Sequence, residues 1–163
     1  MKSGARFGGV FSVICRAKDG TVKWRDTAHN LVVNTGLQYL LDTAFAGSAA
    51  ATFYCGLTDD TPTFSAANTM SNRAGWTEFD EYTGNRQEYV DVRTNQTVSN
   101  TVSTADFPIT GAGGGVGGAF LNTGATGSAG TLLCGAALTG GNRVVATADT
   151  VSVTYTFTAA DDA

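Results

Sequence analysis

The fold class is decided by residues 150–158, which read Thr-Val-Ser-Val-Thr-Tyr-Thr-Phe-Thr. The apolar side chains of Val151, Val153, Tyr155 and Phe157 alternate strictly with hydroxyl side chains. Because successive side chains of a strand point to opposite faces, this pattern predicts a β-strand with one buried face and one face in water. Such a strand is typical of an antiparallel sheet that packs on one side only.

Shorter segments of the same kind precede this strand. They are found at residues 52–57, 76–79, 86–93, 97–102, 105–109, 116–121, 131–137 and 144–146. Short strands that recur about every 8–12 residues, with turn residues between them, are the signature of a sandwich or barrel. We therefore expect an all-β protein, a β-sandwich of immunoglobulin-like or jelly-roll-like type, in which residues 9–163 form a single domain.

A hairpin is predicted near the N-terminus. Residues 9–15 and 21–24 are rich in β-branched and aromatic side chains, and Asp19-Gly20 between them is a strong turn signal. Residues 1–8 are small or polar apart from a few side chains, and we expect a flexible N-terminal arm there. Arg6 and Phe7 on this arm are candidates for ordering against a neighbouring subunit.

Residues 35–45 have a different period from the rest of the chain. Apolar side chains recur there at steps of three and four residues, at Leu37, Leu40, Leu41, Ala44 and Phe45. This spacing predicts one short amphipathic α-helix. Asn34 or Thr35 could cap its start, and Gly47 lies just past its end.

The bulk composition limits the classes of partner. The formal net charge is −4, and the ten Lys and Arg residues are scattered, which argues against binding to nucleic acid. Apolar runs are far shorter than the ~20 residues that span a bilayer, and no secretory signal is visible, so no membrane partner is expected. The three cysteines, Cys15, Cys55 and Cys134, lie far apart, as expected for buried thiols in a reducing cytosol.

A search for chemistry finds no convincing catalytic, cofactor or metal site. The single His29 has no second His or nucleophile motif nearby. Glu78 and Asp80 could share a strand face as paired carboxylates, but an exposed rim explains them as well. Residues 59–61 lack the ligand spacing of a calcium loop, and the glycine run at 111–118 reads as a mobile loop. We expect no enzymatic activity and no cofactor.

Several spaced motifs between Asn30 and Arg86 carry a resemblance to a known family. They are Asn30-Leu-Val-Val-Asn-Thr-Gly-Leu37, Phe53-Tyr-Cys-Gly-Leu57, Asn68-Thr-Met70, Ala74-Gly-Trp-Thr-Glu78, Tyr82 and Arg86. In this pattern the sequence resembles a widespread family of small structural proteins of tailed bacteriophages. The resemblance implies incorporation into the virion. The motif residues also have structural interpretations: Gly36 permits close helix packing, Trp76 supplies apolar burial, and Arg86 could pair with Glu78.

The leading functional hypothesis is a non-enzymatic capsid decoration or cement protein. It would bind the major capsid protein, with further copies of itself as another partner, and would reside in the virion after synthesis in the host cytoplasm. The candidate capsid or inter-subunit contacts are Arg6, Phe7, Phe11 and Trp24.

Two alternatives remain. The first is a tail or fibre-attachment protein. The second, from another class, is a carbohydrate-binding module or a glycosidase domain on a β-sandwich, in which Trp24, Trp76 and Tyr82 would stack on sugar rings.

Overall fold

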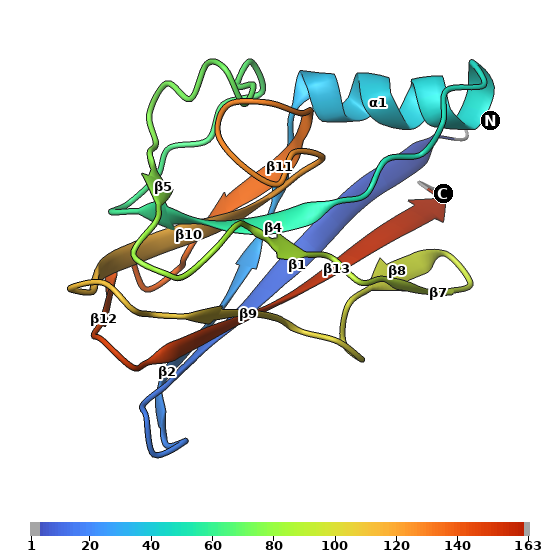
Figure 1. Ribbon diagram of the computed structural model, residues 1–163. Helices are drawn as coiled ribbons and strands as arrows, with labels where there is room; N and C mark the ends of the chain where they lie inside the picture. The colour runs from blue at the N-terminus through green and yellow to red at the C-terminus, as the bar shows by residue number, and fades with distance from the viewer. Residues whose placement is uncertain (1–3, 162–163) are drawn as a thin grey trace.

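The computed structural model describes residues 4–161, which form two antiparallel sheets packed face to face (Figure 1). The first sheet has the order β2-β1-β13-β8-β7, with β9 also paired to β13. Its strands are β1 (Ala5–Arg16), β2 (Val22–His29), β7 (Val92–Thr94), β8 (Thr97–Ser99), β9 (Ala105–Pro108) and β13 (Thr150–Asp161). We call it sheet A.

The second sheet, sheet B, has the order β3-β11-β10-β4-β5. Two further strands join it, because β12 pairs with β10 and β6 pairs with β4. Its strands are β3 (Leu31–Val32), β4 (Tyr54–Asp59), β5 (Glu78–Phe79), β6 (Gln87–Glu88), β10 (Gly114–Asn122), β11 (Leu132–Ala137) and β12 (Arg143–Val145). The predicted all-β sandwich with one short helix is confirmed.

The N-terminal hairpin forms as predicted, but its first strand begins earlier than expected. β1 pairs with β13 from Ala5, opposite Asp161, to Arg16, opposite Thr150. The prediction of a flexible arm is therefore wrong for residues 5–8, because the long C-terminal strand supplies a partner that local sequence cannot reveal. Residues 1–3 of the predicted arm lie outside the described residues.

The alternation in β13 determines which of its faces is buried. Val151, Val153 and Tyr155 are completely buried, and they pack with Phe11 of β1 in the core between the sheets. The phenyl ring of Phe11 stacks on the Tyr155 ring, with 4.3 Å between the ring centroids. The opposite face of sheet A carries the Thr and Ser side chains of β13.

Sheet B is covered on both faces. Its inner face contributes to the central core, whereas a second apolar cluster lies on its outer face, beneath the loop that follows β4. The second cluster consists of Val33, Phe64, Met70, Trp76, Phe120 and Leu132. β10 is accordingly buried along almost its whole length and shows no alternation, as expected for a strand buried on both sides.

The glycine run at 111–118 is mostly strand, and the prediction of a mobile loop there is wrong. Gly114 to Gly118 belong to β10, at the centre of sheet B. A Cβ on Gly117 would overlap the main-chain carbonyl of Asp60, so the absence of a side chain allows the loop after β4 to approach the sheet. The glycines therefore serve close packing.

The segment at 86–93, predicted as one strand, crosses between the sheets. β6 pairs with β4 in sheet B, and β7 pairs with β8 in sheet A. Tyr89 lies at the crossing, where its ring is buried and its hydroxyl donates a 3.1 Å hydrogen bond to the carbonyl of Tyr155. The segment therefore connects the two sheets instead of forming one strand.

The predicted helix is α1 (Asn34–Phe45). Its N-cap is Val33, which provides no side-chain cap; the Thr35 hydroxyl instead donates a 3.1 Å hydrogen bond to the carbonyl of Leu132. Gly36 is the one buried residue of the helix, and a Cβ there would overlap the carbonyl of Leu133. The first turn of α1 is thus held directly against the main chain of β11.

We predict that Gly36→Ala destabilises the protein by about 1–3 kcal/mol, because the added methyl forces the helix away from β11. Helix propensity alone would predict the opposite change, a stabilisation of about 1 kcal/mol, because Ala is a better helix former than Gly. Urea unfolding would measure the change. Gly8→Ala is the matched control, since a Cβ at Gly8 meets nothing within 4 Å. A Gly36→Ala protein as stable as the wild type would contradict this account of the contact.

Candidate functional site

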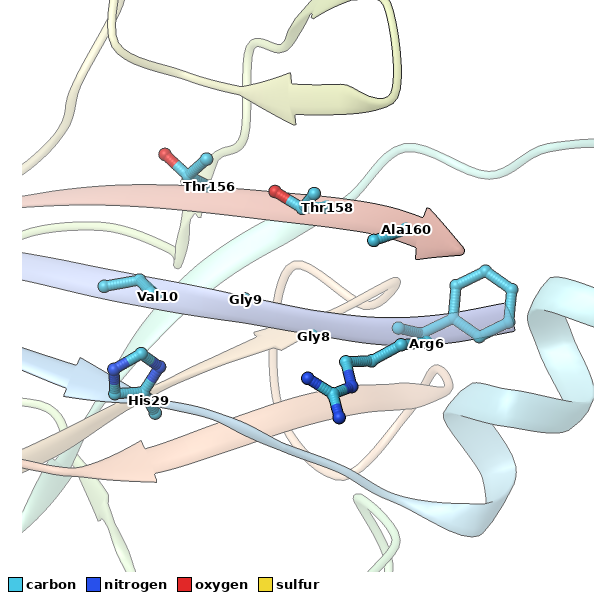
Figure 2. A pocket seen from close by; sticks show the side chains of 9 residues that line it. Arg6, Gly8, Gly9, Val10, His29, Thr156, Thr158 and Ala160 are labelled. Atoms are coloured by element: carbon cyan, nitrogen blue, oxygen red, sulfur yellow. The ribbon is translucent and has the colours of Figure 1, made fainter. Parts of the chain in front are cut away.

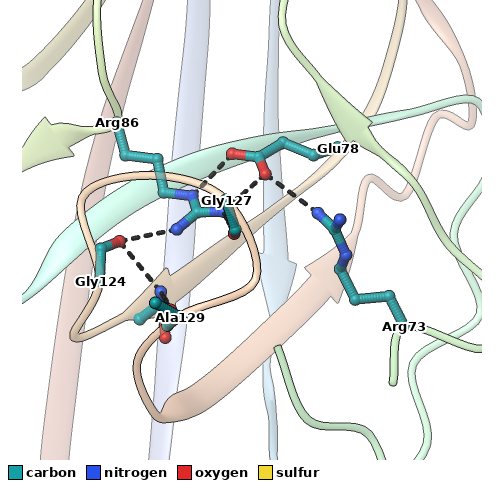
Figure 3. Close-up of polar contacts among 7 residues, drawn as sticks. Arg73, Glu78, Arg86, Gly124, Gly127 and Ala129 are labelled. Atoms are coloured by element: carbon teal, nitrogen blue, oxygen red, sulfur yellow. Dashed lines mark hydrogen bonds and ion pairs between the residues drawn. The ribbon is translucent and has the colours of Figure 1, made fainter. Parts of the chain in front are cut away.

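The acidic residue that most resembles a catalytic group, Glu78, is part of a structural ion-pair network (Figure 3). Arg86 donates to its carboxylate through Nε and Nη2, each at 2.6 Å. Arg73 donates to the same carboxylate at 3.0 Å. Both oxygens of Glu78 are therefore engaged, and the pairing of Arg86 with Glu78 predicted from the sequence is confirmed.

The guanidinium of Arg86 also holds the loop between β10 and β11. It donates to the carbonyl of Gly124 at 2.7 Å and to the carbonyl of Gly127 (Figure 3), and it lies over the Phe120 ring at 5.3 Å. The Arg86 side chain is 1% exposed. A buried cation with all of these partners is a structural link between loops rather than a group available to a substrate.

A second charged link fixes the edge strand β2. Asp26 accepts hydrogen bonds from the main-chain N–H groups of Thr139 and Gly140, at 3.0 and 2.8 Å, and pairs with Arg143 at 3.2 Å. Burial acts to raise the pKa of Asp26, but these hydrogen bonds outweigh it and lower the pKa from 3.8 to about 2. An inward-pointing carboxylate on an edge strand also disfavours pairing with another chain.

The cysteines are unsuited to nucleophilic chemistry. All three are buried and free, as predicted. Burial raises the pKa of Cys15 and of Cys134 to about 11, and it raises that of Cys55 further still, so the reactive thiolate is disfavoured at each position.

The acidic residues after β4 do not form a metal site. Burial, followed by repulsion from Asp60, Asp80 and Glu81, raises the pKa of Asp59. Within residues 4–161 no group of three or more His, Cys, Asp or Glu side chains could hold a metal ion.

The structure separates the four predicted contact residues. Phe11 is wholly buried in the core and cannot contact a partner of the folded protein, so its place among the contacts is wrong. Trp24 lies on β2 near the turn of the hairpin, opposite Cys15 of β1. Its indole N–H donates a 3.0 Å hydrogen bond to the carbonyl of Val144. Arg6 and Phe7 are both exposed at the start of β1, but their side chains point to opposite faces of the strand.

Arg6 borders a shallow hollow on the outer face of sheet A (Figure 2). The hollow has a volume of about 290 Å³, and it opens where Gly8 has no side chain. Other lining residues include His29, Thr156 and Thr158. The imidazole comes from β2, the guanidinium from β1 and the two hydroxyls from β13.

A different, wholly apolar groove lies beside Phe7. It is formed between the start of β1 and the helix α1, and we call it the α1–β1 groove. Its volume is about 310 Å³, and it is lined by Phe7, Leu37, Leu40, Leu41, Ala44 and Phe45. Phe45 is 85% exposed, Leu41 57%, Phe7 44% and Leu37 40%.

The α1–β1 groove is an uncovered continuation of the central core. Phe7 shares a face of β1 with Phe11, because residues four apart on a strand point the same way. Its ring stacks on Phe157 with 6.2 Å between centroids and 10° between ring planes. At Phe11 this face is sealed by sheet B, whereas at Phe7 only α1 approaches it.

Sequence reasoning predicted the amphipathic helix but missed that Leu37, Leu41 and Phe45 remain exposed. These three residues recur every four positions, so they form one stripe along α1. Gly36, the point of closest approach to β11, is about 100° around the helix from Leu37. That offset between the contact glycine and the apolar stripe is the sequence signal that could have revealed the uncovered face.

Three comparisons of the chain, with protein-family models, with curated proteins and with solved structures, gave no match. In the part of the chain that the structure describes, no helix has the length and apolar content needed to cross a membrane. The fold and the site therefore define a class in structural terms only: an all-β sandwich with an exposed apolar groove.

We predict that Arg86→Met costs about 3–5 kcal/mol of unfolding free energy, because it leaves Glu78 and two loop carbonyls without their buried donor. Arg73→Met is the matched control: it removes a partner of the same carboxylate from a half-buried position and should cost about 1 kcal/mol or less. Urea unfolding of both variants tests the difference. Equal losses would show that Arg86 is not the principal partner.

A pH dependence follows from Asp26. Its pKa is lower in the folded protein, so the stability that it contributes is present above about pH 4 and is lost as the pH falls through about 2. The loss should be about 2 kcal/mol at ~1.4 kcal/mol per pKa unit.

Asp26→Asn should flatten this part of the stability profile, measured by urea unfolding at a series of pH values. Asp91→Asn, at an exposed carboxylate between β6 and β7, should leave this acid part of the profile unchanged. An unaltered profile in Asp26→Asn would refute the assignment.

Proposed function

We propose that the protein is a non-enzymatic structural component of a tailed-bacteriophage particle, and that it decorates and stabilises the capsid shell by binding the major capsid protein. In this proposal it is made in the host cytoplasm and resides in the virion. Neither nucleic acid nor a membrane is a partner.

The observation that carries the proposal is the chemistry of the α1–β1 groove. Its lining contains aliphatic and aromatic side chains and no titratable group. Exposed apolar patches of this kind mark sites of association with other proteins, whereas a catalytic pocket needs polar groups that converge on a substrate. This surface therefore supports a role in binding another protein rather than a role in catalysis.

The residues that carry the resemblance to phage structural proteins support the same conclusion. Gly36 seats the helix on β11, Trp76 fills the cluster on the outer face of sheet B, and Arg86 ties Glu78 to the loop between β10 and β11. These three motif positions have scaffold roles. A family defined by such positions shares a fold rather than an active site.

A tail or fibre-attachment protein is the second candidate, since the same surface could dock on a tail component. A sugar-binding role has less support. Trp76 is 6% exposed and Tyr82 9%, so neither ring can stack on a sugar. Trp24 alone of the three is partly accessible.

The test is co-sedimentation of the purified protein with expanded empty capsids, with isolated tails and with host surface polysaccharide. We expect saturable binding to capsids, at a stoichiometry that matches the symmetry of the shell, and none to the other two. Binding to tails alone would overturn the decoration role and favour the second candidate. Binding to polysaccharide alone would overturn the virion role.

A further inference from the structure

The exposed apolar residues of the described chain are distributed unevenly. Five are single valines on strands or loops: Val22, Val90, Val92, Val102 and Val144. The other five are Phe7, Leu31, Leu37, Leu41 and Phe45, of which four line the α1–β1 groove. Isolated valines are normal on a protein surface, but a cluster of two aromatic and two leucine side chains is not.

The neighbourhood of the groove is also poor in charge. Asp42 is the one charged residue of α1, and residues 46–53, which follow the helix, carry none. Arg6 is next to Phe7 in β1, but its side chain lies on the opposite face of the strand, where it borders the hollow on the outer face of sheet A. The groove thus has an apolar centre and little charge near it, so little charge repulsion opposes its contact with a copy of itself.

The main chain of β1 adds hydrogen-bonding capacity beside the groove. Gly9 bonds to Asn30 through both its N–H and its carbonyl, on the side where β2 lies. Because main-chain groups alternate along an antiparallel strand, those of Phe7 point to the same side. β2 pairs with β1 only from Val10 onwards, so the described strands leave the N–H and carbonyl of Phe7 without a ladder partner on that side.

The area of the patch is close to what one subunit of a dimer contributes. At ~200 Å² per ring, the exposed parts of Phe7 and Phe45 amount to roughly 260 Å², and the two leucines bring the patch to about 400 Å². A standard interface buries about 800 Å² per partner, of which about 65% is apolar in homodimers. The patch therefore approaches the apolar share that each subunit of a symmetric dimer supplies.

We propose that the α1–β1 groove is a self-association surface that receives the same groove of a second copy of this chain. The two grooves meet about a two-fold axis, with Leu41 and Phe45 at the centre of the contact. In such an isologous contact, each Phe7 offers one donor and one acceptor to its partner. This inference concerns the same groove as the proposed role in the virion: in the isolated protein a second copy covers the groove, and the dimer must open before the capsid protein can occupy it.

The test is analytical ultracentrifugation of the full-length protein over a range of concentrations. We expect a monomer–dimer equilibrium with a Kd below about 100 µM. Leu41→Glu places a charge in the apolar centre and should raise this Kd by at least about 100-fold. Since Leu41 is already more than half exposed, its urea unfolding curve should match that of the wild type.

Val144→Glu is the matched control. It adds the same charge at another exposed apolar position, 71% accessible and outside the groove, and should leave the dimer intact. A wild-type protein that stays monomeric at the highest concentration would overturn the proposal. So would a dimer that survives Leu41→Glu, or one that Val144→Glu weakens equally. Capsid binding is measured separately with intact capsids, so failure of the dimer and failure of the proposed function are distinguishable.

Discussion

The structure depends on the antiparallel pairing of β1 with β13, its two longest strands. This pairing joins segments at opposite ends of the described chain, so the loop-closure entropy must be offset by what the pair buries. Phe11 and Val13 on one strand and Val153 and Tyr155 on the other are completely buried. β2, β8 and β9 then add to one or other member of the pair. β1 and β13 are therefore the strand pair on which the rest of sheet A is built.

The same pairing creates the exposed groove. β1 continues past the point where β2 stops pairing with it, because β13 still supplies a partner there, and it carries Phe7 beyond the region that sheet B covers. Gly36 holds the first turn of α1 against β11, which fixes how far the helix can reach over Phe7. The later turns of α1 consequently leave Leu41 and Phe45 in solvent. The patch is therefore exposed because β1 is held by β13 and the first turn of α1 is held by β11.

The charged groups contribute to geometry more than to chemistry. Arg86 with Glu78 joins the loop after β10 to sheet B, and Asp26 with Arg143 joins the edge strand β2 to the start of β12. Buried pairs of this kind add little net stability relative to apolar replacements, but loss of one partner is costly. Their effect is to fix the relative positions of the loops and strands that they join.

Local sequence by itself determined the strand at 150–158, the hairpin around Asp19-Gly20, the helix over Leu37 to Phe45 and the burial of the cysteines, because each follows from a short-range period or turn. Tertiary structure alone decided that Phe7 is exposed and Phe11 buried, although both lie on one face of one strand. It also placed Gly117 inside a central strand and divided residues 86–93 between two sheets. The physical reason is common to all three: periodicity shows which side chains share a face, but whether that face is covered depends on segments far away in the chain.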